Sequence, residues 1–184
     1  MEYYTGQLLG LPNGIHFREL VCKWTLKGDL QWARALVEEC SDTLECVDFE
    51  WAAPPMGNSD GAASFDLSKA TKLRHAVFRL HRDYPIWITM ALKTIASERT
   101  ELRISLHVPV YRGSIASSFD VEVVRQWADL EYTLIRLWES HGVRTRVVYD
   151  PGEEKAEARE YIERLLPEVM RRGIIELVVN FSSQ

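Results

Sequence analysis

The chain has 184 residues, of which 46% are hydrophobic and 27% charged, and its formal net charge is −5. These values are typical of a single folded domain and exclude an intrinsically disordered chain. The sequence contains no run of 18 uncharged apolar residues, no signal-peptide pattern and no polybasic block, which argues against membrane insertion, secretion and nucleic-acid binding. Three cysteines without a CxxC pair favour a reducing compartment, so we expect a cytoplasmic or nuclear protein.

A four-position hydrophobic frame recurs along the chain, at offsets 0, +3, +5 and +7. Its members are Phe17, Leu20, Cys22 and Trp24, then Leu44, Val47, Phe49 and Trp51, then Leu73, Ala76, Phe78 and Leu80, and finally Ile174, Leu177, Val179 and Phe181. In a fifth run, which opens at Leu102, the first interval of the frame is one residue shorter. A sixth run, which opens at Val143, matches the frame only loosely. The starts 17, 44, 73 and 102 are separated by 27, 29 and 29 residues, and the later gaps are 41 and 31. A period in the high twenties, with a strand and a helical segment per unit, predicts a solenoid of leucine-rich repeats.

The first half of the chain is predicted to contain three strands and one helix. We expect a lead-in over 1–16, strands over 17–24, 44–51 and 73–80, and a helix from an N-cap at Asp29 to about Cys40. Residues 52–64 contain two prolines and two glycines, which predicts a surface loop. Residues 66–69 would then cover the sheet in place of a helix.

The second half continues the alternation of strands and helices. We expect a helix from about Asp83 and Pro85 to Ile95, strands over 102–109, 143–149 and 174–181, and helices over about 121–140 and 153–172. The apolar side of the 121–140 helix is predicted to comprise Val123, Val124, Trp127, Leu130, Leu134, Leu137 and Trp138. The six tryptophans mostly fall on such apolar faces, so we expect them in the core rather than in a base-stacking platform.

Two architectures fit this order of elements, a solenoid and a doubly wound α/β sheet covered on both faces. Charged or polar residues alternate with the frame residues along the strands, at Lys23, Asp48, Glu50, Arg79 and His107. One face of the sheet is therefore expected to be exposed to solvent. The predicted fold class is therefore α/β, a short ribonuclease-inhibitor-like leucine-rich-repeat solenoid. It would have about six parallel strands, with helices on the convex side, in one domain over 1–184.

Several segments resemble the C-terminal repeat region of fungal F-box/leucine-rich-repeat proteins. They are GIHFRELVCKW (14–24), LVEECSDTLECVDFEW (36–51), FDLSKATKLRHAVFR (65–79), ITMALKTI (88–95), LRISLHVPV (102–110) and LWESHGVRTRVVY (137–149). The resemblance extends over about 14–180 and is to the repeats alone, since no F-box-like segment precedes Phe17 in this sequence. It implies a non-enzymatic adaptor, in which the repeats hold a target protein and an F-box recruits a ubiquitin ligase.

No catalytic constellation stands out in the sequence. His81-Arg82-Asp83 matches the start of a kinase catalytic loop, but Ile88 replaces the asparagine expected five residues after the aspartate. The histidines form neither HxxxH nor HExxH, so we predict no metal and no cofactor. Cys22 is expected to point inward and Cys46 outward, each packing as a small hydrophobe.

The outward-facing row of the sheet is the candidate partner-binding surface. It is predicted to comprise Lys23, Asp48, Glu50, His75, Arg79, His107, Arg144, Arg146 and Asn180. Acidic residues on the second strand would be followed by basic residues on the third to fifth, and such polarity guides the orientation and rate of association. The alternative is a sheet face that is merely solvated.

Three hypotheses of function follow. The first is a protein–protein interaction module that binds another protein on its concave strand row, without nucleic-acid or membrane partners. The second is a small α/β enzyme or redox protein that uses Cys46 with His75, which requires a strongly lowered thiol pKa at Cys46. The third is a degenerate repeat fragment, whose uncapped ends would self-associate.

Overall fold

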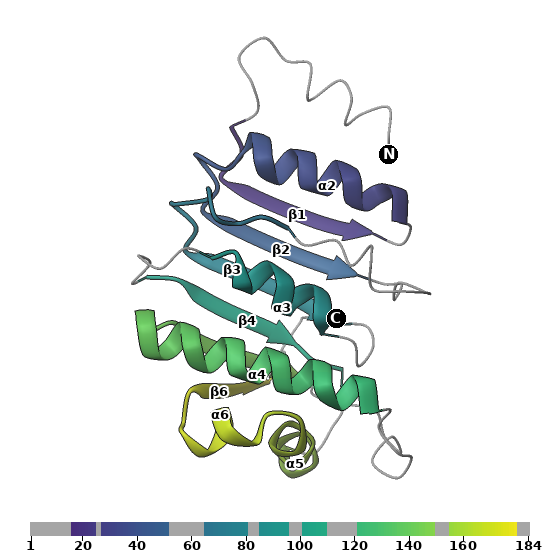
Figure 1. The fold of residues 1–184 in the computed structure, drawn as a ribbon, viewed down its shortest axis with the longest axis vertical. Coiled ribbons are helices and arrows are strands. Elements are labelled where there is room, and N and C mark those ends of the chain that lie inside the picture. The colour runs from purple at the N-terminus through teal and green to yellow at the C-terminus, as the bar shows by residue number, and fades with distance from the viewer. Residues whose placement is uncertain are drawn as a thin grey trace.

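Six strands and five helices lie in the part of the chain that the computed structural model describes, residues 16–24, 27–51, 65–80, 85–95, 101–109, 121–149 and 155–179. The strands are β1 (Glu19–Trp24), β2 (Cys46–Trp51), β3 (His75–Leu80), β4 (Arg103–His107), β5 (Arg144–Tyr149) and β6 (Ile175–Val179). The helices are α2 (Lys27–Glu39), α3 (Ile86–Lys93), α4 (Val121–His141), α5 (Lys155–Leu165) and α6 (Pro167–Arg171) (Figure 1). Each predicted strand is present, with bounds within two residues of those expected from the sequence.

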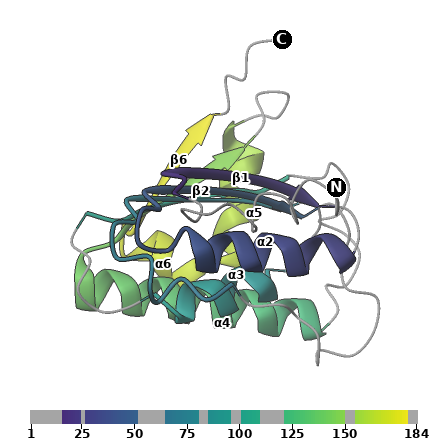
Figure 2. The ribbon, with the colours of Figure 1, turned by 90° about the horizontal axis from the view of Figure 1, so that it is seen from above.

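The strands form one sheet in the order β1-β2-β3-β4-β5-β6, and every neighbouring pair is parallel. The prediction of an α/β chain with consecutive parallel strands side by side is confirmed. The crossover of strand order that a doubly wound sheet requires does not occur among these strands. Figure 2 shows α2, α3 and α4 on the same side of the strands, with β6 turned away from the direction of β1 and β2, as the intrinsic twist of sheets produces.

The strand register places the hydrophobic frame in rows. One row consists of Leu20, Val47, Ala76, Ile104, Thr145 and Ile175, and the next of Cys22, Phe49, Phe78, Leu106, Val147 and Leu177. The frame offsets align the first three strands correctly. In the last strand they are two residues out of step, because Leu177 pairs with Val147 and so belongs to the second row.

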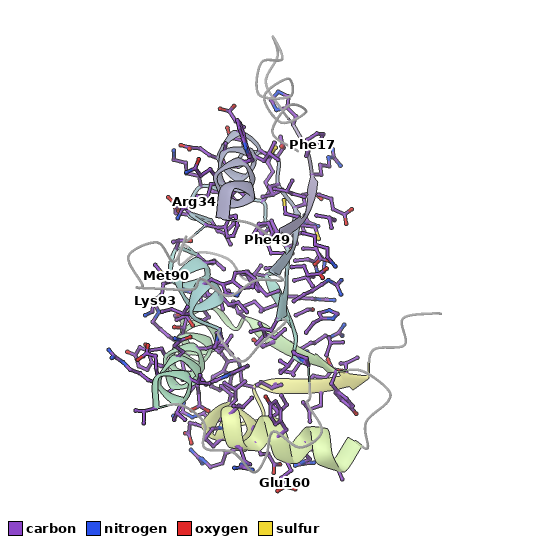
Figure 3. All side chains as sticks on the ribbon, turned by 90° about the vertical axis from the view of Figure 1, so that its right-hand side faces the viewer. Phe17, Arg34, Phe49, Met90, Lys93 and Glu160 are labelled. Atoms are coloured by element: carbon purple, nitrogen blue, oxygen red, sulfur yellow. The ribbon has the colours of Figure 1, made fainter. Side chains whose placement is uncertain are left out.

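One hydrophobic core lies between the sheet and the helices, and Figure 3 shows Phe49 pointing into it while Arg34 and Lys93 point outward. Phe49 stacks on Phe65 with ring centroids 4.4 Å apart. The segment 65–73 therefore covers the sheet without a helix, as predicted for residues 66–69, and Phe65, Leu67 and Ala70 are fully buried in the core. Thr94 Oγ1 accepts a 2.8 Å hydrogen bond from the backbone N–H of Leu67, which ties this segment to the end of α3.

Two expectations about the helices are wrong. Helix α2 begins at Lys27, so Asp29 lies within its first turn and is not its N-cap. The expected single helix over 153–172 is divided into α5 and α6, because Leu166 has φ −134° and ψ 58°. Proline disfavours helical geometry at the residue before it, and Pro167 then starts the next helix at its first position.

Three apolar side chains expected in the core are exposed. Phe17 is 39% exposed, Val124 52% and Trp138 39%. Phe17 precedes the first strand of the sheet, where no earlier strand lies beside it among the described residues. Val124 and Trp138 lie at the margin of the apolar arc of α4, beyond the part of the helix that the core covers. Trp87 and Trp127 are buried, as expected for core tryptophans.

Several sequence-based predictions fall outside the described residues. They concern residues 1–15 of the lead-in predicted over 1–16, the loop over 52–64, the His81-Arg82-Asp83 motif and Asn180.

Candidate functional site: the open face of the sheet

Three rows of side chains project from the side of the sheet opposite the helices, and we call this surface the open face. The first row is Glu19, Cys46, His75, Arg103 and Arg144, the second is Val21, Asp48, Val77, Ser105, Arg146 and Glu176, and the third is Lys23, Glu50, Arg79, His107, Val148 and Val178. Burial alternates along the strands, so that in β5 Arg144 and Arg146 are exposed while Thr145 and Val147 are buried. The expectation that one face of the sheet is exposed to solvent is confirmed. All the predicted site residues except Asn180, which lies outside the described part, are on the open face.

An internal ion pair joins Asp48 of β2 to Arg79 of β3. Arg79 donates from Nε to Asp48 Oδ1 at 2.8 Å and from Nη2 to Oδ2 at 2.7 Å, and its Nη1 lies 3.3 Å from His107 Nδ1. The hydrogen bonds to Asp48 raise the pKa of the Arg79 guanidinium. Such a bidentate contact fixes the conformation of both side chains, so the centre of the open face is pre-organised.

Two further pairs neutralise charge across the strands. Lys23 Nζ lies 2.5 Å from Glu50 Oε1, and Arg146 Nε donates to Glu176 Oε2 at 2.8 Å. The predicted separation into an acidic second strand and basic later strands is therefore weaker than the sequence indicates, because each of the acids Asp48 and Glu50 has a cationic partner on an adjacent strand.

A hollow of about 1040 Å³ opens at the edge of the sheet where β3 to β6 begin. Its polar and aromatic lining includes Arg74, His75, Glu101, Arg103, Trp138, Arg144, Arg146 and Glu176. The sequence-based site did not include Arg103. The hydrophobic run that opens at Leu102 is one residue shorter than the frame, so the frame offsets did not assign a side of the sheet to Arg103. Counting back from Ile104, which is fully buried, would have placed Arg103 outward.

The redox hypothesis requires a strongly lowered thiol pKa at Cys46, and the surroundings of that thiol act in the opposite direction. Cys46 and His75 are direct neighbours across β2 and β3, as the redox hypothesis needs. However, burial and the nearby Glu19 and Asp48 carboxylates raise the pKa of Cys46, opposite to the predicted requirement. Burial also raises the pKa of Cys22 to about 11. Within the described ranges no three His, Cys, Asp or Glu side chains gather as a metal site.

No known protein family, curated protein or solved structure matches this chain. The resemblance to fungal F-box/leucine-rich-repeat proteins stays a prediction. In the described part of the chain, no helix combines the length and apolar character needed to cross a membrane. The open face and the hollow at its edge are the candidate functional surfaces of the described chain.

Proposed function

We propose that this chain is a non-enzymatic protein-interaction module of the leucine-rich-repeat type, which binds a protein partner on the open face. The observation that carries the proposal is the asymmetry of the sheet. One face is sealed by helices and core side chains, and no described element covers the other. Solenoid repeats use such strand faces to hold partners.

A recurring backbone contact supports the repeat architecture. The N–H of Cys46 donates to the carbonyl of Arg18 at 2.9 Å, and the N–H of His75 donates to the carbonyl of Glu45 at 3.1 Å. Arg103 makes the same contact with Arg74 at 2.8 Å. Successive units thus enter the sheet through one local geometry, as stacked repeats with nearest-neighbour interfaces do.

The mixed character of the open face favours protein recognition over chemistry. Val21 is 66% exposed, and Val77 lies half-buried between Asp48 and Ser105 in the middle row. Apolar side chains surrounded by ordered polar groups are typical of non-obligate protein interfaces. The raised pKa of Cys46 supplies no competing argument for thiol catalysis.

A matched pair of substitutions tests this surface. Val77→Lys adds bulk and charge at the centre of the open face, next to Asp48, without entering the core. Tyr132→Lys makes the same change from apolar to cationic on α4, where Tyr132 is 69% exposed. The immobilised chain should capture proteins from an extract of its native cell that Val77→Lys loses and Tyr132→Lys retains, as quantified by mass spectrometry. Equal capture by the two variants would refute the open face as the binding surface.

The resemblance suggests a biological setting for this module. If the repeats hold a ubiquitin-ligase target, a fusion of an F-box segment to this chain should lead to ubiquitylation of the captured protein in cells. The same fusion carrying Val77→Lys should not. Ubiquitylation that is identical in the two fusions would separate the adaptor role from the open face. The expected cytoplasmic or nuclear location stays a prediction.

A further inference from the structure

The charges that line the hollow do not cancel. It contains four arginines (Arg74, Arg103, Arg144 and Arg146) and two glutamates (Glu101 and Glu176). Glu176 pairs with Arg146 at 2.8 Å, and Glu101 lies 3.8 Å from Arg74. Each glutamate thus has its own arginine. Arg103 and Arg144 are left without a carboxylate partner among the described residues.

The two unpaired arginines are direct neighbours. Each is the first residue of its strand, and the register places Arg103 of β4 opposite Arg144 of β5. Adjacent strands lie roughly 4.8 Å apart, and like charges directly opposite one another destabilise a sheet. His75 extends the row as the direct neighbour of Arg103 on β3. This arrangement of like charges does not stabilise the fold, whereas a bound anion could contact both Arg103 and Arg144.

The hollow also offers an apolar wall. Trp138, at the end of α4, is 39% exposed and lines the same space as Ile174 and Ile175. A volume of about 1040 Å³ exceeds the need of a single ion and lies at the upper end of the range for ligand pockets. The site is therefore suited to a chain segment that carries both acidic and apolar side chains.

We propose that this hollow binds an acidic segment of a partner protein, whose carboxylates are taken by Arg103 and Arg144 while an apolar side chain lies against Trp138. The inference rests on the proposed interaction role and names the chemistry of the partner. Glu176 on Arg146 is an internal example of the same contact. The net charge of −5 opposes both kinds of polyanion, but it opposes an extended nucleic acid more than a short acidic segment, because a nucleic acid carries a charge at every nucleotide along its whole length.

The test uses the full chain and a fluorescein-labelled octapeptide in which glutamate and leucine alternate, with binding followed by fluorescence anisotropy. A peptide with glutamine in place of glutamate is the neutral control. We expect saturable binding of the acidic peptide that weakens with salt. Arg103→Ala and Arg144→Ala should each weaken it about threefold, and the double variant about tenfold, as expected for exposed charge pairs.

Two further variants sharpen the test. Arg125→Ala removes one positive charge from an exposed position of α4 outside the hollow, so binding should change less than about twofold. Glu176→Gln releases Arg146 from its internal partner and should tighten binding about threefold. Removal of one arginine from a like-charged pair should leave the melting temperature unchanged or raise it, so the losses cannot be assigned to misfolding.

Several outcomes would overturn the inference. They are equal binding of the acidic and neutral peptides, an unchanged affinity in the Arg103→Ala/Arg144→Ala double variant, and tighter binding of a single-stranded octanucleotide than of the peptide. The proposed function is tested separately by Val77→Lys. Val77→Lys could abolish capture of the partner while the hollow fails to bind the acidic peptide. That combination would support the interaction module and reject only the proposed chemistry of its partner.

Discussion

Burial raises the pKa of the Cys22 thiol to about 11, from an ordinary value of 9.0. The folded chain therefore holds this proton more tightly than the unfolded chain. The resulting stability is fully present below pH 9 and is lost as the pH rises through 11. Between pH 8 and pH 10.5 we expect Cys22 to account for a loss of about 2 kcal/mol in the free energy of unfolding.

Urea denaturation under reducing conditions at these two pH values measures that loss. Cys22→Val should flatten the alkaline decline by about 2 kcal/mol relative to the native chain. Val21→Ala, on the exposed neighbouring residue, is the control and should leave the decline unaltered. A decline as steep in Cys22→Val as in the native chain would show that this thiol does not carry the effect.

The Asp48–Arg79 pair should be stronger than other cross-strand pairs of the open face. Its side chains are 17% and 36% exposed, whereas those of Glu176 and Arg146 are 63% and 50% exposed. Double-mutant cycles with Asp48→Asn and Arg79→Gln should give a coupling of about 1 kcal/mol or more, because the contact is two-pronged and partly shielded from water. The matched cycle of Glu176→Gln and Arg146→Gln should give less than about 0.5 kcal/mol. Equal couplings would contradict the role assigned to shielding.

Residue patterns predicted which side chains face outward but not which of them pair. Alternation along each strand was sufficient to place Asp48 and Arg79 on one face. Register sets Arg79 directly opposite Glu50, yet Arg79 bonds the diagonal Asp48 while Glu50 bonds Lys23. Direct and diagonal neighbours on adjacent strands are both within reach of a long side chain, so spacing alone does not decide between them.

At the scale of single elements, α6 depends on a side chain from another helix. Glu131 of α4 accepts hydrogen bonds from the backbone N–H groups of Glu168, at 2.5 Å, and Val169, at 3.1 Å. These N–H groups lie in the first turn of α6, where they have no partner within the helix. A carboxylate there also interacts favourably with the helix dipole.

Removal of this cap should destabilise the C-terminal end of the sheet. We expect Glu131→Ala to lower the free energy of unfolding by about 1–2 kcal/mol and Glu131→Gln by roughly half of that, since the amide keeps an acceptor but loses the charge. Glu160→Ala on α5, whose labelled side chain points away from the protein in Figure 3, is the control and should change little. Thermal melts provide the measurement. Equal effects of Glu131→Ala and Glu160→Ala would exclude the capping role.

A glycine follows the end of both α4 and α6, and its backbone conformation gives the reason. Gly142 has φ +65° and Gly173 φ +68°, in the left-handed region that L side chains rarely adopt. Gly142→Ala should cost about 1 kcal/mol through the backbone alone, because a Cβ there meets nothing within 4 Å. Gly142→Asn should cost less, since asparagine tolerates this conformation better. Chemical denaturation that ranks alanine and asparagine in the opposite order would contradict a purely backbone cause.

At the scale of the whole molecule, the order and direction of the strands could be predicted because a hydrophobic frame recurs along the chain, most regularly in the first three strands. Its offsets place Leu20, Val47 and Ala76 in one row, as the structure does. Prediction was weaker at β4, where the hydrophobic run is one residue short and Arg103 was lost from the candidate site, and at β6, where the frame is two residues out of step with the register. The hollow was not predicted, because its lining comes from four groups of residues, 74–75, 101–103, 138–146 and 173–176, that are far apart from one another in sequence.

Binding of a partner on the open face requires that this face stays accessible in the free chain. Val77→Cys and Ala76→Cys place a thiol on adjacent residues of β3, one on the open face and one in the core, where Ala76 is fully buried. Maleimide labelling at neutral pH, read at each site by mass spectrometry, should be at least about 100-fold faster at position 77 than at position 76, where reaction requires local or global unfolding. Comparable protection of both thiols in the free chain would mean that the open face is covered, by the remaining chain or by a second copy, and would contradict the proposed binding surface.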